Sequence, residues 1–140
     1  MSCLFCQIIT GETSAHVVLD EPDVVGFLDA RPLFKGHVLV VPRVHIPTLT
    51  DVPENLLAPL LGTAQRVAAA VVRASGAQGS FVAMNNVVSQ SVPHLHVHVV
   101  PRTKGDGLRG FFWPRTRYDD DDDAMRHAQQ VRAALSASGQ

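Results

Sequence analysis

Three histidines occur at alternate positions in the segment His94–Val100, which reads HLHVHVV. Side chains on a β-strand alternate between its two faces, so this spacing predicts that all three imidazoles lie on one face. An imidazole titrates near neutral pH and can act as a nucleophile, as an acid or base, or as a metal ligand. Residues two and four apart on a strand are separated by about 6.6 and 13 Å. One metal ion held by all three side chains is therefore disfavoured, and a division of roles among them is easier to build.

The two cysteines of the chain, Cys3 and Cys6, form a C-x-x-C motif. Three interpretations are open: two idle or buried thiols, a redox pair, or half of a zinc site. A thioredoxin-type redox motif follows a strand and opens a helix, whereas this motif lies at the start of the sequence. A zinc site needs two further ligands, which the motif itself does not identify.

The rest of the sequence predicts the elements that must position these side chains. Apolar periodicity and turn residues indicate helices at 4–10, 53–74 and about 120–136. Apolar runs indicate strands at 17–19, 24–28, 37–41, 80–85 and 94–100, with Pro42 and Pro101 ending two of them. Strands that outnumber the helices and form hairpins predict an α+β fold with a mainly antiparallel sheet, a central helix and a helix at each end. No repeat or linker divides the chain, so a single domain over residues 1–140 is expected.

Composition and charge exclude several classes of protein. Apolar residues make up 46% of the 140 residues, which is enough for a core and too many for a disordered chain. Lys and Arg number 12 against 13 Asp and Glu, so a basic footprint for nucleic acid is absent. The sequence has no run of 18 apolar residues to span a membrane and no signal-peptide pattern, so a cytoplasmic protein is expected. The acidic run Asp119–Asp123 is interpreted as charge on the first turn of the last helix, not as a metal cluster.

Several segments together resemble one family. The segment His94–Val100 fits the His-φ-His-φ-His-φ-φ signature of the histidine triad nucleotide-binding family, where φ is an apolar residue. Further similarity to that family lies in Cys3–Ile9, in Val25–Asp29 with Pro32, in Gly36–His45 and in Gln90–Pro93. The resemblance covers nearly the whole chain and implies a histidine triad fold that forms a homodimer.

The resemblance also implies an enzyme. It would be a hydrolase or nucleotidyl transferase that cleaves a nucleoside monophosphate, with AMP expected, from its leaving group. The middle histidine, His96, would attack the α-phosphorus and form a covalent nucleotidyl-histidine that water then hydrolyses. The backbone carbonyl of His94 would hold the other ring nitrogen of His96. His98 would donate a hydrogen bond or a proton to the leaving group, Ser91 and Gln90 would hold phosphate oxygens, and His37 would line the active site.

A purine nucleotide site is implied in the same way. Asp29 would accept hydrogen bonds from the ribose hydroxyls, and its alternative is an ordinary turn residue. The side chains that would wall the base are ordinary core in most proteins. The implied nucleotide-binding set comprises Phe5, Ile8, Phe27, Asp29, Asn85, Gln90, Ser91, His96 and His98. Residues 86–89 form a shorter loop than the family's and lack its glycine, so Asn85 and Asn86 are both candidates for the family's asparagine.

A structural zinc ion is the implied cofactor. Bacterial members with this N-terminus resemble a Cys₂His₂ site, which here would consist of Cys3, Cys6, His45 and His94. The dipeptide Trp113-Pro114 resembles the family's C-terminal Trp-Pro, which reaches toward the partner's active site.

Other functions stay open at this point. A close variant of the hydrolase is a dinucleoside polyphosphate hydrolase. A different class is a nucleotide- or zinc-binding regulatory protein with negligible turnover. A catalytic zinc at His96 is a third possibility, which the spacing along the strand disfavours.

Overall fold

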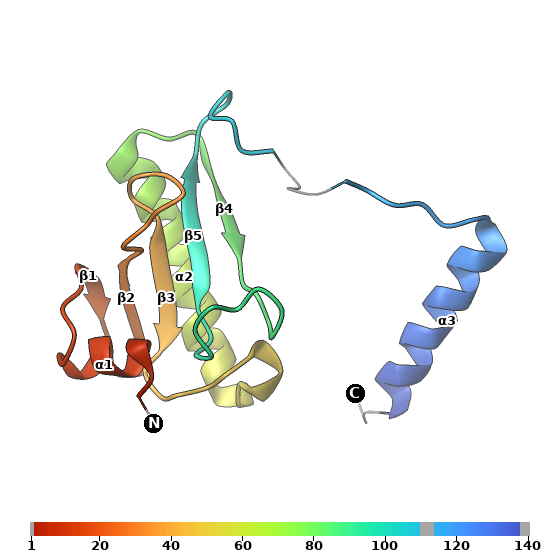
Figure 1. The fold of residues 1–140 in the computed structure, drawn as a ribbon, viewed down its shortest axis with the longest axis horizontal. Coiled ribbons are helices and arrows are strands. Elements are labelled where there is room, and N and C mark those ends of the chain that lie inside the picture. The colour runs from red at the N-terminus through yellow and green to blue at the C-terminus, as the bar shows by residue number, and fades with distance from the viewer. Residues whose placement is uncertain (1, 110–113, 138–140) are drawn as a thin grey trace. The chain divides into compact units, whose positions relative to one another are not determined.

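The computed structural model describes residues 2–109 and 114–137, and these form two compact units, Met1–Asp106 and Gly107–Gln140. The elements of the first unit are α1 (Leu4–Thr10), β1 (Val17–Asp20), β2 (Val24–Leu28), β3 (Val38–Pro42), a short 3-10 helix (Leu49–Asp51), α2 (Glu54–Ser75), β4 (Gly79–Ala83) and β5 (Val97–Arg102), as Figure 1 shows. The second unit contains α3 (Asp121–Ala137). A single domain over the whole chain stays a prediction.

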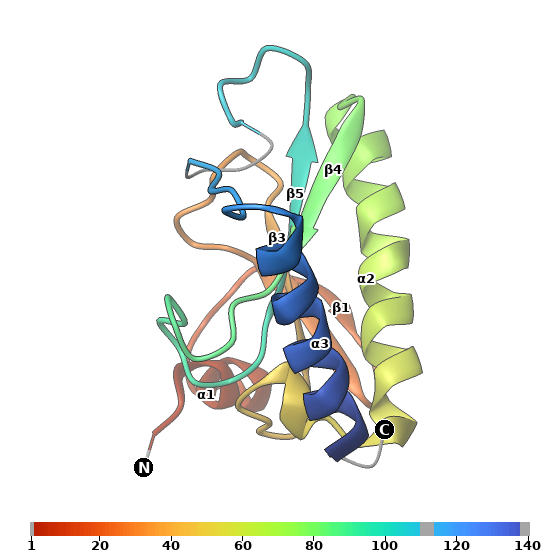
Figure 2. The ribbon, with the colours of Figure 1, turned by 90° about the vertical axis from the view of Figure 1, so that its right-hand side faces the viewer.

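The five strands form one sheet in the order β1-β2-β3-β5-β4, and every neighbouring pair is antiparallel. Figure 2 shows that α2 covers one face of this sheet and that α1 lies on the opposite face. The expected α+β fold with an antiparallel sheet is confirmed.

Strand alternation divides the core into two layers. Side chains on the face toward α2 are Val24, Val38, Val40, Leu95, Val97 and Val99, and they pack with Leu60, Ala64, Val67 and Val71 of α2. The other face carries Val25, Phe27, Leu39 and Val41, which pack with Phe5 of α1. Because neighbouring residues of one strand belong to different layers, the histidines between Leu95, Val97 and Val99 must point to the α1 face.

The helix α2 is long and apolar enough to cross a membrane by length and composition alone. Its buried residues Leu60, Val67 and Val71 instead form the core against the sheet. The helix ends at Gly76, which adopts the left-handed conformation (φ 70°) that glycine tolerates best.

The expected bounds of the last strand are wrong at both ends. Regular pairing begins at Val97 because the preceding backbone turns elsewhere: the amide of Leu95 donates to the carbonyl of Ile46 at 2.7 Å. Pro101 does not end the strand, which continues to Arg102. Pairing with β3 stops at Val99, so β5 has an unpaired side beyond that residue, where proline is tolerated.

The second unit confirms the interpretation of the acidic run. Asp121, Asp122 and Asp123 occupy the first turn of α3, where negative charge interacts favourably with the helix dipole. Trp113, to which a role at the partner's active site was assigned by resemblance, lies outside the described residues.

Candidate active site and metal site

The three triad histidines share the α1 face but sit in different local structures. His98 is part of β5, whereas His94 and His96 precede the strand. The side chain of His94 is fully buried, that of His96 is 5% exposed, and His98 is half-buried. The rings of His96 and His98 are neighbours, with centroids 5.0 Å apart.

One hydrogen bond sets the tautomer of His96. Its Nδ1 lies 2.8 Å from the carbonyl oxygen of His94. A carbonyl can only accept, so Nδ1 carries a proton, and in the neutral ring Nε2 is the nitrogen that has the lone pair. The ring of Phe5 packs edge-on against His96 at a centroid distance of 5.0 Å and fixes its orientation. In its neutral form, His96 therefore presents a positioned Nε2 that can act as a nucleophile.

A second chain of hydrogen bonds sets the tautomer of His98. The backbone amide of Leu33 donates to Nδ1 of His37 at 3.1 Å, so the proton of His37 is on Nε2. That Nε2 donates to Nδ1 of His98 at 3.0 Å. His98 must then carry its own proton on Nε2. The site thus offers a hydrogen-bond donor, His98, beside a nucleophile, His96.

The electrostatics of the site agree with these neutral tautomers. The pKa of His98 is lowered to about 4, mainly by burial and also by the neighbouring His96 and His37, against the opposing effect of Asp29. Burial also lowers the pKa of His37, with Asp29 again opposing. Both imidazoles are therefore uncharged near neutral pH.

Asp29 follows β2 and faces His37. Its Oδ1 accepts a hydrogen bond from the amide of Arg31 at 2.9 Å, so Asp29 does form the turn that was its alternative interpretation. Its Oδ2 lies 3.7 Å from Nε2 of His37, and the side chain is 23% exposed. One carboxylate oxygen thus remains at the edge of the histidine cluster, where a ligand hydroxyl could reach it.

The loop that precedes the triad uses its amide side chains internally. Nδ2 of Asn85 donates to the carbonyl of Ser89 at 3.3 Å. The Gln90 amide is engaged at both ends: Oε1 accepts from the amide of Val87 at 2.9 Å, and Nε2 donates to the carbonyl of Pro47 at 2.6 Å. Ser91 is exposed, and its hydroxyl has no hydrogen-bond partner among the described residues.

The three side chains expected to wall the purine belong mainly to the core. Phe5 and Phe27 are 5% and 2% exposed and pack edge to face at 5.4 Å, while Ile8 is half-buried at the margin of the same cluster. Only Ile8 therefore offers appreciable apolar surface in this arrangement.

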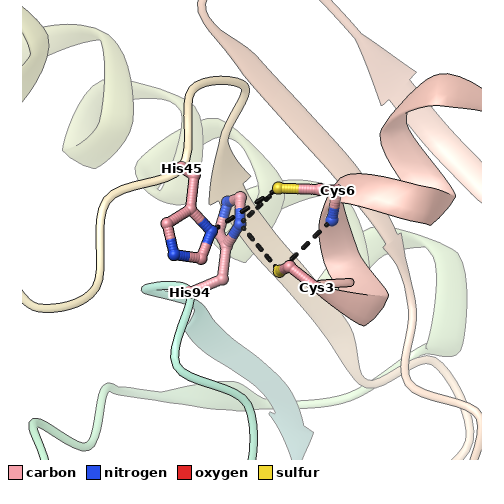
Figure 3. A group of neighbouring side chains, drawn as sticks. All are labelled: Cys3, Cys6, His45 and His94. Carbon is pink, nitrogen blue, oxygen red and sulfur yellow. Dashed lines mark hydrogen bonds between the residues drawn. The ribbon is translucent and has the colours of Figure 1, made fainter. Parts of the chain in front are cut away.

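Two cysteines and two histidines converge beside the triad, as Figure 3 shows. Sγ of Cys3 lies 3.5 Å from Nδ1 of His94, and Sγ of Cys6 lies 3.6 Å from the same atom and 3.5 Å from Nδ1 of His45. Zinc–sulfur bonds of 2.3 Å and zinc–nitrogen bonds of about 2.0 Å at tetrahedral angles place a sulfur and a nitrogen about 3.5 Å apart. These three sulfur–nitrogen distances match a tetrahedral zinc ion, and all four ligand atoms lie within 4.8 Å of one another.

Two further features suit this group to a cation. Nε2 of His94 donates to the carbonyl of Pro42 at 2.8 Å, which leaves the Nδ1 lone pair facing the sulfurs. Burial raises the pKa of the Cys6 thiol most, and the hydrogen bond with Cys3 and the repulsion between the two thiolates raise it further. A bound zinc ion would remove that repulsion.

A second group with metal-ligand chemistry, Asp29, His37 and His98, is less suitable. The amide of Leu33 occupies Nδ1 of His37, so the nitrogen that faces His98 carries a proton. A metal ion there would have to displace that proton and leave the Leu33 amide facing another N–H group. This cluster is therefore built for hydrogen bonding.

Backbone groups in the site were missed by the sequence analysis. The amide of Leu33 and the carbonyls of Pro42 and Pro47 orient His37, His94 and Gln90. Backbone atoms are present in every residue, so no pattern of residue types could have indicated them. The contact of the Asn86 side chain was missed only in part, because the sequence analysis named Asn86 as one of two candidates for the family's asparagine. Its Oδ1 accepts a hydrogen bond from the amide of Leu49 at 2.7 Å.

Comparison with known proteins gives a consistent family. Residues 10–105 match the family model of the HIT domain. An uncharacterized HIT-like protein of Mycobacterium tuberculosis is 36% identical over all of this chain and 99% of its own. Adenylylsulfatase HINT3 of Arabidopsis thaliana is 32% identical over 76% of this chain and 55% of its own. Adenosine 5'-monophosphoramidase HNT1 of Candida albicans is 29% identical over 86% and 83%.

Solved structures agree with this assignment. A HIT family member from Bacillus subtilis matches with a TM-score of 0.85 at 28% identity and covers 95% of this chain and 96% of its own. The histidine triad nucleotide-binding protein from Candida albicans matches with a TM-score of 0.83 at 26% identity, covering 98% and 99%. A zinc-bound histidine triad family protein from Mycobacterium smegmatis is 35% identical, with a TM-score of 0.73 and coverage of 99% and 98%. The chain therefore belongs to the HIT, or histidine triad, family.

Proposed function

We propose that this protein is a nucleotide hydrolase that cleaves a nucleoside monophosphate from its leaving group through a covalent intermediate on His96. The nucleoside monophosphate that we expect is AMP. The observation that carries the proposal is the fixed pair of tautomers: an Nε2 lone pair on His96 beside an Nε2–H donor on His98. The names of two relatives, an adenylylsulfatase and an adenosine monophosphoramidase, support the adenylyl group as substrate.

The reaction would proceed in two displacements. Nε2 of His96 attacks the α-phosphorus, the bond from phosphorus to the leaving atom breaks, and the positive charge that develops on the imidazole is stabilised through Nδ1–H and the carbonyl of His94. His98 donates a hydrogen bond from Nε2 to the departing atom. Water then attacks the same phosphorus, and the phosphorus–nitrogen bond breaks with its electron pair returning to Nε2 of His96. The proton that the water loses balances the one that the leaving group takes up, so the nucleoside monophosphate is released with His96 regenerated.

Substrate binding would use residues around this pair. Asp29 would accept hydrogen bonds from the ribose hydroxyls through Oδ2, the oxygen that does not form the Arg31 turn. Ser91, with its hydroxyl unpartnered among the described residues, would donate to a phosphate oxygen. Ile8 would contact the base at the margin of the Phe5 cluster.

We further propose that Cys3, Cys6, His45 and His94 hold a structural zinc ion. All four ligands come from the protein, so no position is left for a reacting water, and the ion would supply a cross-link between α1 and the sheet. The zinc-bound relative from Mycobacterium smegmatis supports the metal. The two free thiols are also suited to the reducing cytoplasm, where we place the protein.

A homodimer is proposed because part of the first unit carries uncovered apolar surface. The strand β4 is at the edge of the sheet and contacts α2, and Val82 on β4 and Leu61 on α2 are both 45% exposed. An open strand edge beside apolar side chains is the kind of surface that proteins cover by association.

The central experiment measures turnover of an adenosine phosphoramidate by the wild type and by His96→Ala. Wild-type turnover and its loss in the variant are expected, with AMP affinity kept within about tenfold because ribose and base contacts lie elsewhere. Absence of wild-type turnover on phosphoramidates, adenylates and dinucleoside polyphosphates alike would favour a regulatory binding protein instead.

A further inference from the structure

The loop between β4 and the triad is bound by side chains to the segment that follows His45. Gln90 donates through Nε2 to the carbonyl of Pro47 at 2.6 Å, and Asn86 accepts through Oδ1 from the amide of Leu49 at 2.7 Å. The backbone amide of Leu95, within the triad segment, donates to the carbonyl of Ile46 at 2.7 Å and joins the same two segments. Three hydrogen bonds therefore join residues 86–95 to residues 46–49.

The backbone of this loop needs such support. Val87 and Ser89 both have left-handed backbone conformations, with φ of 71° and 62°. This conformation is unusual for any residue other than glycine and most unusual for a β-branched one such as Val87. Unfavourable conformations persist only where the surroundings hold them. Here the Gln90 side chain holds the conformation of Val87, because Oε1 of Gln90 accepts a hydrogen bond from the Val87 N–H at 2.9 Å.

We propose that Gln90 and Asn86 form a clamp, a pair of positioning residues that holds the short loop and thereby sets the place of the phosphate-binding Ser91. In this account Gln90 does not bind the phosphate itself. Both ends of its amide are already used within the protein, and a bond to phosphate would require Nε2 to leave the carbonyl of Pro47. The inference rests on the proposed function, because it concerns how the nucleotide's phosphate is held.

The two residues differ in a way that makes the clamp testable. Gln90 is adjacent to Ser91, so loss of phosphate affinity in a Gln90 variant could reflect either a direct contact or the clamp. Asn86 is five residues from Ser91, and its Oδ1 accepts from Leu49. The Oδ1 of Asn86 has no proton to donate to phosphate, whereas its Nδ2 has two, so affinity alone does not separate a direct contact from the clamp. The signature of the clamp is therefore an effect of Asn86 on phosphate binding together with faster amide exchange at Val87.

The test compares Asn86→Ala, Gln90→Met and the double variant, with Val88→Ala as the matched control. Val88 lies in the same loop and is 78% exposed, and its backbone bond to Asn86 survives the substitution. Calorimetric titration with AMP and with adenosine, which lacks the phosphate, separates phosphate contacts from those of the nucleoside. Each single variant should weaken AMP by about tenfold and adenosine by less than about twofold. The double variant should be no weaker than about the worse single variant, because both substitutions open the same loop.

Two results would overturn the clamp. One is normal AMP affinity in Asn86→Ala together with a large loss in Gln90→Met, which would make Gln90 a direct phosphate ligand. The other comes from amide hydrogen exchange, which needs no ligand: Gln90→Met should speed exchange at Leu49 as well as at Val87, and Asn86→Ala should speed exchange at Val87. The clamp would be contradicted if Gln90→Met left exchange at Leu49 unchanged and Asn86→Ala left exchange at Val87 unchanged. If the wild type bound no AMP but the two variants changed exchange as expected, only the proposed function would be contradicted.

Discussion

Acidification should destabilise the native protein through His98, and the size of the effect follows from its surroundings. His98 is half-buried, and its Nδ1 accepts a hydrogen bond from Nε2 of His37. Of the titratable groups that face it, His96 and His37 oppose a positive charge there and Asp29 favours one. The net result is a pKa of about 4, against 6.5 for an imidazole in water.

The sign of the effect is set by which state binds the proton more readily. Between pH 6.5 and about 4 the unfolded chain protonates His98 while the native protein does not, so stability falls as the pH falls through that range. Each unit of pKa difference corresponds to 1.36 kcal/mol, so the full shift corresponds to about 3 kcal/mol. The contribution is complete above pH 6.5 and is lost progressively toward pH 4.

Urea unfolding at several pH values measures this directly. The wild type is compared with His98→Asn, and His16→Asn, an exposed histidine on the same unit, is the matched control. Other groups titrate in the same range, so the quantity of interest is the difference between wild type and variant as a function of pH. We expect that difference to change by about 3 kcal/mol between pH 7 and 4 for His98→Asn and by less than about 0.5 kcal/mol for His16→Asn. A pH-independent difference for His98→Asn would refute the argument that His98 is held neutral.

Three further predictions concern the ribose, the metal and the dimer. Asp29→Asn keeps an oxygen that can accept from the amide of Arg31 but removes the negative charge. Ribonucleotides should therefore bind at least about tenfold more weakly, while the affinity for 2′,3′-dideoxynucleotides stays unchanged. Equal weakening of both would mean that Asp29 is a turn residue only. The purified protein should contain about one zinc ion per chain, Cys3→Ser should release it, and chelation should lower the melting temperature, because binding to a site absent from the unfolded chain is folding free energy. A metal-free protein of unchanged stability would exclude the site. Leu61→Glu should convert a dimer into a monomer in sedimentation analysis, whereas the exposed Gln65→Glu on the same helix should not.

The fold could be predicted largely because its periodicities are strong. Continuous apolar runs defined β2 and β3, and the stripe that includes Leu60, Val67 and Val71 defined α2, so these elements agree with the structure within a few residues. The triad strand was placed less well, because the alternation of His94 and Leu95 continues outside regular pairing. Side-chain alternation depends on an extended backbone, and an extended segment such as this one need not belong to the ladder.

The candidate site could be predicted only where side chains carry it. The histidines and cysteines were identifiable by type and spacing, and their convergence rests on distances that no sequence pattern contains. Among the backbone partners that set the tautomers, the carbonyl of His94 is an exception because the family resemblance implied it, whereas nothing indicated the amide of Leu33 or the carbonyl of Pro42. The engagement of Gln90 was equally hidden, since it depends on the left-handed turn at Val87 and on the approach of Pro47 from a distant part of the chain.

The covalent intermediate is the central claim, and trapping it is the most direct test. The wild type is mixed with an adenosine phosphoramidate, quenched within the first turnovers under alkaline conditions that preserve phosphorus–nitrogen bonds, digested and analysed by mass spectrometry. The account predicts one adenylyl group on the peptide that contains the triad, located on His96 and absent from the His96→Ala protein. Turnover without any adduct, or an adduct on His98 in place of His96, would contradict it.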